Sequence, residues 1–392
     1  MNSMWSLKRD VNIAMDILLF MVSINFMHLG QLILPVMCLI LFIDNKFKFN
    51  VNNFKIFAVL CLFGLSFFVF SEKNLYCVMG FTFPMAYYIG SNIQCGDEKN
   101  IKKAIFIIAL GMISHVLLNF VYDLSLMGMD TFISLPHYDI WTRDSLLTTI
   151  TAIEYTIPLS LIYYLTIYED NKKIKYGFLL AIVLMMIYDF ALGRRTPILM
   201  LFVSLFVSFI LDNFILGKKK IVKSIIIIFI ALIVLLALVI CMSKYNLFGL
   251  GEFINSFVII KKFIWEGLDA ERFEIFIDAI KIAPNHLWGK QEISTMLGTL
   301  VHELWMDIFD YAGIIPYILM IIYSVYFLVQ IYKLYKKNNY SKEIKVLVLT
   351  LVSCCIVHMF LEPMMSNATI FLNCVIIIGT VIEKGNLNVE KN

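Results

Sequence analysis

The sequence predicts an all-α, polytopic integral membrane protein, and two observations lead to that fold class. The first is composition: 60% of the 392 residues are hydrophobic and only 16% are charged, with a mean hydropathy of +0.84. Soluble domains carry about 25% charged residues, so this chain cannot hide its apolar surface in one water-soluble core. The second is a series of about twelve apolar runs long enough to form membrane-crossing helices. Together these observations exclude a cytosolic enzyme, a secreted disulfide scaffold and a nucleic-acid-binding protein.

Each span is predicted from hydropathy, because a bilayer core about 30 Å thick needs about 20 apolar helical residues. In chain order the predicted spans are residues 11–28, 30–44, 54–71, 75–90, 103–121, 146–168, 175–192, 196–215, 222–242, 312–331, 344–361 and 367–383. The second, fourth and twelfth of these are short. No small-residue cleavage site follows the first apolar run, so we expect a retained helix there and not a signal peptide.

The basic residues orient these spans. Of the 32 Lys and Arg residues, 22 fall in alternate connecting segments and at the chain ends, and ten fall in the other segments. Cytoplasmic loops carry the excess of basic residues in membrane proteins. We therefore expect an even number of spans, cytoplasmic N- and C-termini, and a single transmembrane domain over residues 1–392. The predicted cytoplasmic loops are short and lack a Gly-rich phosphate motif, so ATP-driven work is not expected.

Three segments on the predicted outer side have unusual sequences. The loop at about 122–145 is rich in Asp, and residues 193–197 form a very short Gly-Arg-Arg-Thr-Pro turn. The stretch over 243–311 is long enough to fold locally. We expect it to be a large extracytoplasmic loop that contains amphipathic helices.

Arginine is concentrated on that outer side, where four of the five arginines lie. A planar guanidinium binds phosphate or carboxylate through two parallel hydrogen bonds and keeps its charge when desolvated. The simpler interpretation is snorkelling to the interface, which we favour for Arg143. Arg194 and Arg195 are adjacent in a tight turn and repel each other unless an anion is nearby. Asp189 and Glu154 are alternative, structural partners for this pair.

Arg272 opens a stretch with apolar residues at helical spacing, which ends at Pro284. The apolar positions i, i+3, i+4 and i+7 are Phe273, Phe276, Ile277 and Ile280. Acidic residues crowd the first turn, as a helix of this polarity prefers. This pattern predicts an amphipathic helix on the outer membrane surface with Arg272 near its start. The alternative is a plain surface helix whose arginine pairs with a neighbouring glutamate.

His302 precedes a second amphipathic stretch. On a helical wheel one side holds Leu304, Trp305, Ile308 and Phe309, and the other side holds Glu303, Asp307 and Asp310. His302 falls at the boundary, where a histidine near acidic groups can accept or orient a proton near neutral pH. The alternative is a hydrogen-bonded structural histidine. A metal site is not expected, because position 306 is Met and not the second His of a zinc-binding HExxH motif.

Three stretches within residues 190–320 carry a resemblance to a known family. Residues 193–199 (Gly-Arg-Arg-Thr-Pro-Ile-Leu) are similar to a small-residue/Arg-Thr-apolar turn that opens a membrane helix. Residues 272–284 are similar to an Arg-x-x-x-aromatic…Pro element, and residues 302–315 to a His-Asn/Asp-x-x-Leu…Gly-Ile-Ile element. In this order, and on one side of about twelve spans, they resemble the O-antigen polymerase and O-antigen ligase superfamily of bacterial surface-polysaccharide assembly. Two departures are Glu303 in place of Asn or Asp, and a single Gly289 where the family often has several glycines.

The resemblance implies a glycosyltransferase-type polysaccharide polymerase in the bacterial cytoplasmic membrane, without metal or cofactor. Its donor would be an oligosaccharide on undecaprenyl pyrophosphate, and its acceptor another glycan of an O-antigen or capsule. We expect Arg195 and Arg272 at the pyrophosphate, with Arg194 assisting, since arginines can stabilise the charge of the leaving group. His302 would orient or deprotonate the acceptor hydroxyl. Membrane lipid, a chain-length regulator and a flippase are the further partners expected.

Three other functions stay open at this point. An O-antigen ligase would transfer the glycan to a terminal acceptor, and no residue identifies that acceptor. A lipid-linked oligosaccharide flippase also needs about twelve spans, but it should place several charges deep within them. Charge within the predicted spans is sparse, with Asp16 the clearest case. A structural membrane subunit is the third alternative.

Overall fold

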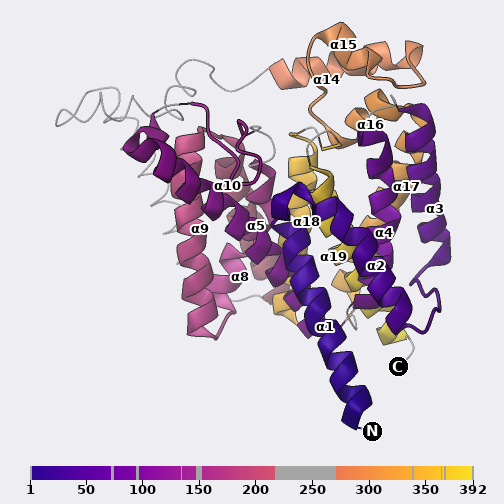
Figure 1. Ribbon diagram of the computed structural model, residues 1–392, viewed down its shortest axis with the longest axis vertical. Helices are drawn as coiled ribbons and strands as arrows, with labels where there is room; N and C mark the ends of the chain where they lie inside the picture. The colour runs from indigo at the N-terminus through magenta and orange to yellow at the C-terminus, as the bar shows by residue number, and fades with distance from the viewer. Residues whose placement is uncertain are drawn as a thin grey trace. The chain divides into compact units, whose positions relative to one another are not determined.

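The computed structural model is all-α over the residues that it describes (Figure 1). These are residues 2–71, 75–93, 97–133, 135–146, 152–216, 271–337, 340–362, 364–365 and 368–390. Among them, the one strand-like pairing is an antiparallel bridge between Tyr138 and Ser145. The chain divides into two compact units, of which the first comprises residues 1–115, 270–345 and 355–392, and the second residues 116–269 and 346–354.

Five helices in the described ranges are long and apolar enough to cross a membrane, which supports a multi-pass membrane protein. They cover Glu98–Phe132, Lys172–Leu192, Thr196–Asn213, Ile314–Lys336 and Thr369–Asn388. Shorter apolar helices cover Val11–Ser23, Gly30–Asp44, Phe54–Phe70 and Ala152–Ile167. A total of twelve spans is not shown, and the predicted span at 222–242 lies outside the described residues. The predicted span at 75–90 is divided between a 3₁₀ segment and a short α-helix.

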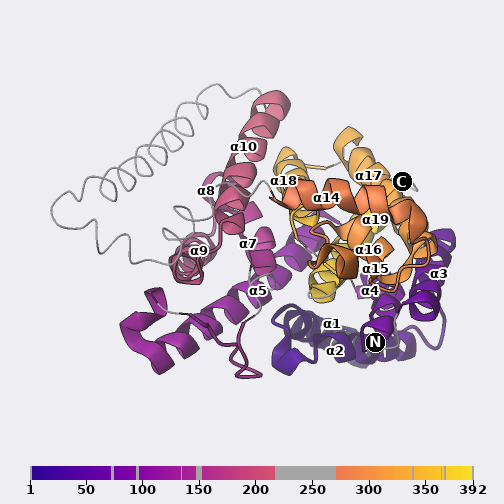
Figure 2. The same ribbon diagram turned by 90° about the horizontal axis from the view of Figure 1, so that it is seen from above.

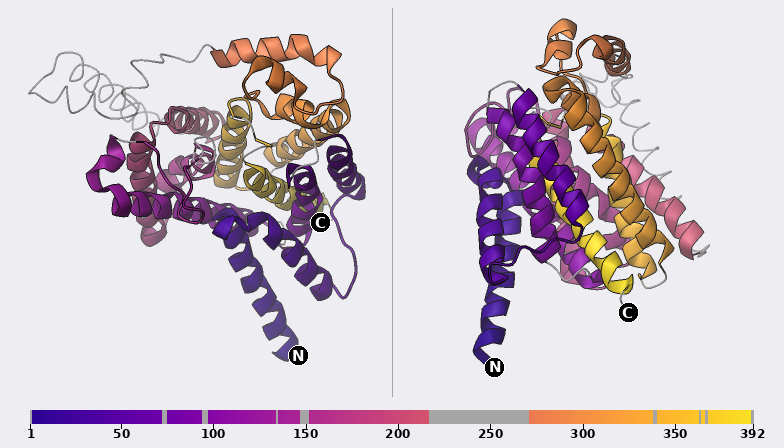
Figure 3. Two further views of the ribbon diagram at one scale, coloured as in Figure 1. Left: turned by 45° about the horizontal axis from the view of Figure 1, so that its top comes forward. Right: turned by 90° about the vertical axis from the view of Figure 1, so that its right-hand side faces the viewer.

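The first unit is a helical bundle with a smaller group of helices across one end. Its elements are α1 (Asn2–Ser23), η1 (Phe26–His28), α2 (Gly30–Asp44), α3 (Phe54–Phe70), η2 (Leu75–Phe81), α4 (Thr82–Ile93), the first part of α5 (Glu98–Met127), α14 (Glu271–Ile282), η5 (Ala283–Asn285), α15 (Glu292–Leu297), α16 (Leu304–Ala312), α17 (Ile314–Lys336), both ends of α18 (Lys342–Met359) and α19 (Thr369–Glu390). α14 and α15 lie across one end of this bundle, and both chain termini lie at the opposite end (Figures 1 and 3). Seen from above, α14 and α16 lie over α17 and α19 (Figure 2).

α19 is the central helix of this bundle. It packs against α1, α4 and α17. In its apolar window 83% of the residues are buried, against 28% for α17, so α17 presents an outer face. Polar side chains of α19 find partners on the surrounding helices, as buried polar groups must. Asn373 donates to the Thr82 hydroxyl at 2.9 Å, and Glu383 accepts from Tyr87 at 2.7 Å and from Tyr326.

The second unit contains the rest of α5 and three shorter elements, followed by two long helices. They are η3 (Gly128–Phe132), α7 (Thr156–Ser160), α8 (Ile162–Ile167), α9 (Lys172–Leu192) and α10 (Thr196–Leu216), together with the middle of α18. α10 packs on α7 and α8, and α9 packs on α8 and η3. The hydroxyl of Ser204 donates to the carbonyl of Leu159 at 2.9 Å, which ties α10 to α7.

The contact between α4 and α19 depends on a glycine. A Cβ at Gly90 would lie 2.7 Å from Thr380 Cβ and 2.8 Å from the Ile377 carbonyl oxygen. Real Cβ atoms do not approach backbone this closely, so α4 can pack against the central helix only without a side chain at this position.

Replacing Gly90 by Ala should therefore force α4 away from α19 and lower the free energy of unfolding by about 1–3 kcal/mol. The matched control is Gly177→Ala in α9, where a Cβ meets nothing within 4 Å. The control should be neutral or stabilising by up to about 1 kcal/mol, because Ala is the better helix former. Thermal unfolding of both variants in detergent measures the difference, and equal stabilities would contradict the close packing.

Candidate functional site

Two of the sequence-predicted segments meet in the group of helices across the end of the first unit. Arg272 lies in the first turn of α14, and His302 lies two residues before α16 begins. Ala279 of α14 is fully buried in a hydrophobic cluster with Val301 and Phe309, against which Phe276 also packs. The segments that carry Arg272 and His302 therefore share one hydrophobic core, although 30 residues separate them in the sequence.

α14 is amphipathic, as predicted, but only part of its apolar face is packed against protein. Phe276 and Ile277 are half-buried, whereas Phe273 is 67% exposed and Ile280 is 48% exposed. Two large exposed side chains on one helix are typical of a helix that contacts lipid headgroups and acyl chains. The membrane-surface location of α14 stays a prediction.

The loop from η5 to α15 lies directly on the junction of α16 and α17, and two glycines allow this approach. Gly289 and Gly313 both have positive φ, 76° and 82°. A Cβ on Gly289 would be 2.5 Å from the Gly313 nitrogen, and a Cβ on Gly313 would be 2.4 Å from the Leu287 carbonyl oxygen. The amide of Ile314 donates to that same Leu287 oxygen at 2.9 Å. The Gly289 and Gly313 noted in the sequence thus meet in the structure.

The acidic side of α16 faces protein. The helical wheel separates Glu303, Asp307 and Asp310 from the apolar residues, and all three are at most 5% exposed. Burial raises the pKa of Asp307 to about 8 and the pKa of Glu303 to about 7, and it also raises the pKa of Asp310. A buried carboxyl group needs hydrogen-bond donors, so each of these acids has an anchoring partner.

Each of the three acids accepts hydrogen bonds from backbone amides of a different segment. Glu303 caps α16 by accepting from the amide of Met306 at 2.7 Å. Asp307 accepts from the amide of Met365 at 2.6 Å, which ties α16 to the connection before α19. The bonds of Asp310 to α15 come from the Ile293 amide at 2.9 Å, the Ser294 amide at 3.2 Å and the Ser294 hydroxyl at 2.5 Å. These carboxyl groups thus hold the start of α16, the start of α15 and the backbone at Met365 together.

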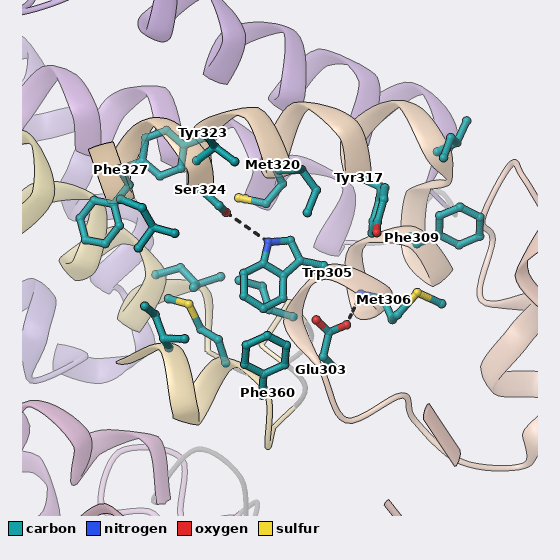
Figure 4. A pocket seen from close by; sticks show the side chains of 18 of the residues that line it. Glu303, Trp305, Met306, Phe309, Tyr317, Met320, Tyr323, Ser324, Phe327 and Phe360 are labelled. Carbon is teal, nitrogen blue, oxygen red and sulfur yellow. Dashed lines mark hydrogen bonds between the residues drawn. The ribbon is translucent and has the colours of Figure 1, made fainter. Parts of the chain in front are cut away.

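A pocket of about 830 Å³ lies beneath these helices, wholly within the first unit. Its roof comes from α14, η5 and α16, and its walls come from α17, α19 and the end of α18. The lining is almost entirely apolar and aromatic (Figure 4). The rings of Trp305 and Phe360 pack 4.9 Å apart, and the Trp305 indole donates to the Ser324 hydroxyl at 3.1 Å.

Glu303 contributes a carboxyl group to the lining of this pocket. One carboxylate oxygen is used in the cap of α16, and the other is directed toward Trp305 (Figure 4). Sequence reasoning assigned the proton-transfer role to His302, which is half-buried and directly precedes it. The sequence feature that marks Glu303 is that it stands where the resembled family has Asn or Asp. A carboxyl group with a pKa of about 7 in an apolar pocket is suited to general acid–base chemistry near neutral pH.

Arg194 and Arg195 belong to the second unit, in the turn between α9 and α10. Gly193, with a φ of 65°, ends α9 in the left-handed conformation that glycine adopts readily. Arg194 is buried and its charge acts on the fully buried Asp189, one of the two structural partners considered from the sequence. Arg195 is the more exposed of the two. For Arg194 the structural interpretation is therefore favoured, and Arg195 is the better candidate for binding an external anion.

The four predicted site residues thus fall into two pairs, Arg272 with His302 in one unit and Arg194 with Arg195 in the other. Within the described ranges, no group of three His, Cys, Asp or Glu side chains could hold a metal ion. The chain matches no protein-family model, and no curated protein matches it. Residues 243–270 of the predicted outer loop lie outside the described residues.

Replacing Asp307 by Asn should remove a pH dependence of stability. An Asp side chain has an ordinary pKa of 3.8, and that of folded Asp307 is about 8. Between these values the folded protein holds a proton that the unfolded chain has released, so its free energy of unfolding falls as the pH rises. Thermal unfolding in detergent at pH 5 and pH 8 should show a smaller pH difference for Asp307→Asn than for the wild type.

Asp307→Ala is the paired variant, since it removes the acceptor for the Met365 amide that an Asn carbonyl can still provide. It should be less stable than Asp307→Asn by about 1–3 kcal/mol, the cost of an unsatisfied buried donor. An unchanged pH difference in Asp307→Asn, or equal stability of the two variants, would contradict the anchoring role.

Proposed function

We propose that this protein polymerises lipid-linked oligosaccharide repeat units into a surface polysaccharide at the outer face of the bacterial cytoplasmic membrane. The observation that carries the proposal is the apolar pocket, which is roofed by the same two segments that the sequence marks as functional. Small-molecule pockets typically enclose about 300–1,000 Å³ with a mostly apolar lining and a few placed polar groups. This pocket fits that description and suits part of a polyprenyl chain.

In the proposed reaction a hydroxyl of the acceptor glycan attacks the anomeric carbon of the donor sugar. The new glycosidic bond forms as the bond from that carbon to the pyrophosphate oxygen breaks, and the hydroxyl proton passes to a base. The energy is stored in the bond between the donor sugar and the pyrophosphate, and the polyprenyl pyrophosphate leaves intact, which fits a chain without a nucleotide motif. Cations that face the leaving pyrophosphate stabilise the charge that develops on it.

As expected from the sequence, Arg272 and Arg195 are each proposed as a pyrophosphate-binding residue, and Arg194, whose charge acts on the buried Asp189, is proposed to support Arg195. His302 is proposed to orient or deprotonate the acceptor hydroxyl, as predicted from the sequence. Glu303 adds a second titratable group next to it, on the side that lines the pocket. No nucleic acid, metal or cofactor takes part in this scheme.

Deletion of the gene, followed by gel analysis of the surface glycan, separates the proposal from its rivals. Loss of a polymerase should leave single repeat units attached to the cell surface. Loss of a ligase should leave none attached, and loss of a flippase should trap lipid-linked units on the inner side. Long glycan chains in the deletion strain would contradict all three assignments.

Arg272→Ala and His302→Ala should each reduce glycan chain extension by about 10²–10³-fold, the usual cost of losing one group that stabilises a transition state. The matched control for Arg272 is Lys281→Ala on the same helix, since Lys281 is exposed and pairs with Asp278 at 2.8 Å. Chain lengths on gels and protein levels in membranes should be measured together. Normal chain lengths in the Arg272 and His302 variants would exclude these residues from the site.

The pH dependence tests the role of Glu303. Because burial raises its pKa to about 7, a base at this position loses its proton, and becomes active, as the pH rises through 7. Polymerisation by the wild type in vesicles should therefore rise with pH over this range, and Glu303→Gln should be slow and lack the rise. If the rise persists in Glu303→Gln and disappears in His302→Ala, the base is His302 alone.

A further inference from the structure

The second unit contains a buried hydrogen-bond network that no part of the proposed reaction uses. Its members are Asp123 near the end of α5, His137 in the following loop, and Tyr188 near the end of α9. Asp123 and Tyr188 are fully buried, and His137 is 3% exposed. The network therefore joins two of the outer segments noted in the sequence, the Asp-rich loop and the Gly-Arg-Arg turn that follows α9.

Asp123 is the acceptor at the centre of this network. Its Oδ2 accepts from the Tyr188 hydroxyl at 2.6 Å and bonds to Nδ1 of His137 at 2.8 Å. Its Oδ1 accepts from the backbone amide of Tyr138 at 3.0 Å. Three donors on one buried carboxylate satisfy its charge without water.

The other ring nitrogen of His137 faces the α9 backbone. Nε2 lies 3.0 Å from the carbonyl oxygen of Ala191. Each of the two ring nitrogens of His137 thus has a hydrogen-bond partner, Asp123 on one side and the Ala191 carbonyl on the other. The His137 ring therefore links Asp123 to the last turn of α9, where backbone carbonyl groups lack helical partners.

The loop that presents His137 is itself fixed to α5. The amide of Ile140 donates to the Asn119 side chain at 3.0 Å, and the amide of Leu146 donates to the His137 carbonyl at 2.7 Å. Asn119 is fully buried. His137 is thus held by a rigid loop, and it can impose a position on the segment that it contacts.

That segment is the end of α9, three residues before Arg194. α9 ends at Leu192, one residue beyond Ala191, and the amide of the next residue, Gly193, donates to the Asp189 carbonyl at 2.9 Å. The bond from His137 to Ala191 therefore fixes a carbonyl group in the last turn of α9, just before the chain turns. The turn that carries Arg194 and Arg195 follows directly after this last turn of α9.

We propose that His137, held by Asp123, is a positioning residue for the Gly193–Arg195 turn. This positioning role rests on the proposed function in one respect, namely that Arg195 binds a pyrophosphate group. His137 does not contact the pyrophosphate group. It fixes the end of α9, and the end of α9 in turn sets the position of Arg195.

A pair of amide substitutions separates the two bonds of His137. Gln places its amide near the Nε2 position and can still donate to the Ala191 carbonyl, whereas Asn places its amide near Nδ1 and reaches only Asp123. Hydrogen exchange of peptides covering residues 189–197, in full-length protein in nanodiscs, reports the order of the turn. Peptides from α16 are the control for general loss of stability.

His137→Asn should speed exchange of the turn by about tenfold, the effect of losing one buried hydrogen bond, and His137→Gln should keep exchange slow. The α16 peptides should not change in either variant. Equal exchange of the turn in the wild type and both variants would overturn the proposal, and so would equal acceleration in both variants.

Binding of inorganic pyrophosphate to the same samples tests the step that rests on the proposed function. The wild type and His137→Gln should bind with similar affinity, and His137→Asn should bind about tenfold more weakly through the displaced turn. Arg195→Ala should lose binding with no change in exchange at the end of α9. If the wild type binds no pyrophosphate while the exchange pattern is as expected, the positioning role stands and the proposed function fails.

Discussion

Buried acidic side chains that accept hydrogen bonds from backbone amides hold three segments at helix ends and in loops of the described chain in place. A long helix satisfies its own backbone groups, but a turn or connection in apolar surroundings cannot, and each unpaired amide there would cost about 1–3 kcal/mol. In the first unit Asp310 provides acceptors for the start of α15, and Asp307 for the connection before α19. In the second unit Asp123 does the same for the loop at Tyr138. These acids are part of the scaffold, and the candidate site depends on them.

The pocket is a consequence of that anchoring. α16 is held at its start by Glu303 and along its acidic side by Asp307 and Asp310, so its apolar side faces α17, α18 and α19. α14 completes the roof because Ala279 packs into the same core as Val301. The result is an apolar pocket with a carboxyl group on its wall. An apolar pocket with a carboxyl group on its wall suits a lipid-linked substrate, because the apolar lining can hold the lipid and Glu303 can take part in proton transfer.

Much of the fold could be predicted because apolar runs and helical periodicity are local properties. Hydropathy correctly predicted α-helices over most of the described spans, and the amphipathic pattern from Phe273 to Ile280 predicted α14. The count of spans could not be settled in the same way, since residues 75–90 are apolar enough but begin as a 3₁₀ segment. Local pattern does not reveal where backbone geometry departs from the α-helix.

Contacts between residues that are far apart in the sequence could not be predicted, for a different reason. A helical wheel separates polar from apolar residues. It does not show whether the partner of a polar residue such as Asp307 is water or a buried backbone amide. Glu303 was noted only as a departure from a family pattern, and its position on the pocket wall became visible in three dimensions. The bond between His137 and Ala191 joins residues 54 positions apart, and no spacing rule predicts it.

In the proposed function, the apolar pocket holds the lipid chain of the substrate. Photo-crosslinking with a polyprenyl pyrophosphate that carries a diazirine on its chain tests this claim most directly. With purified protein in nanodiscs, mass spectrometry should place the adducts on peptides that contain Trp305, Ser324 and Phe360, and unlabelled polyprenyl pyrophosphate should compete them away. Adducts spread evenly over the exposed faces of α2 and α9, and unaffected by the competitor, would contradict the account.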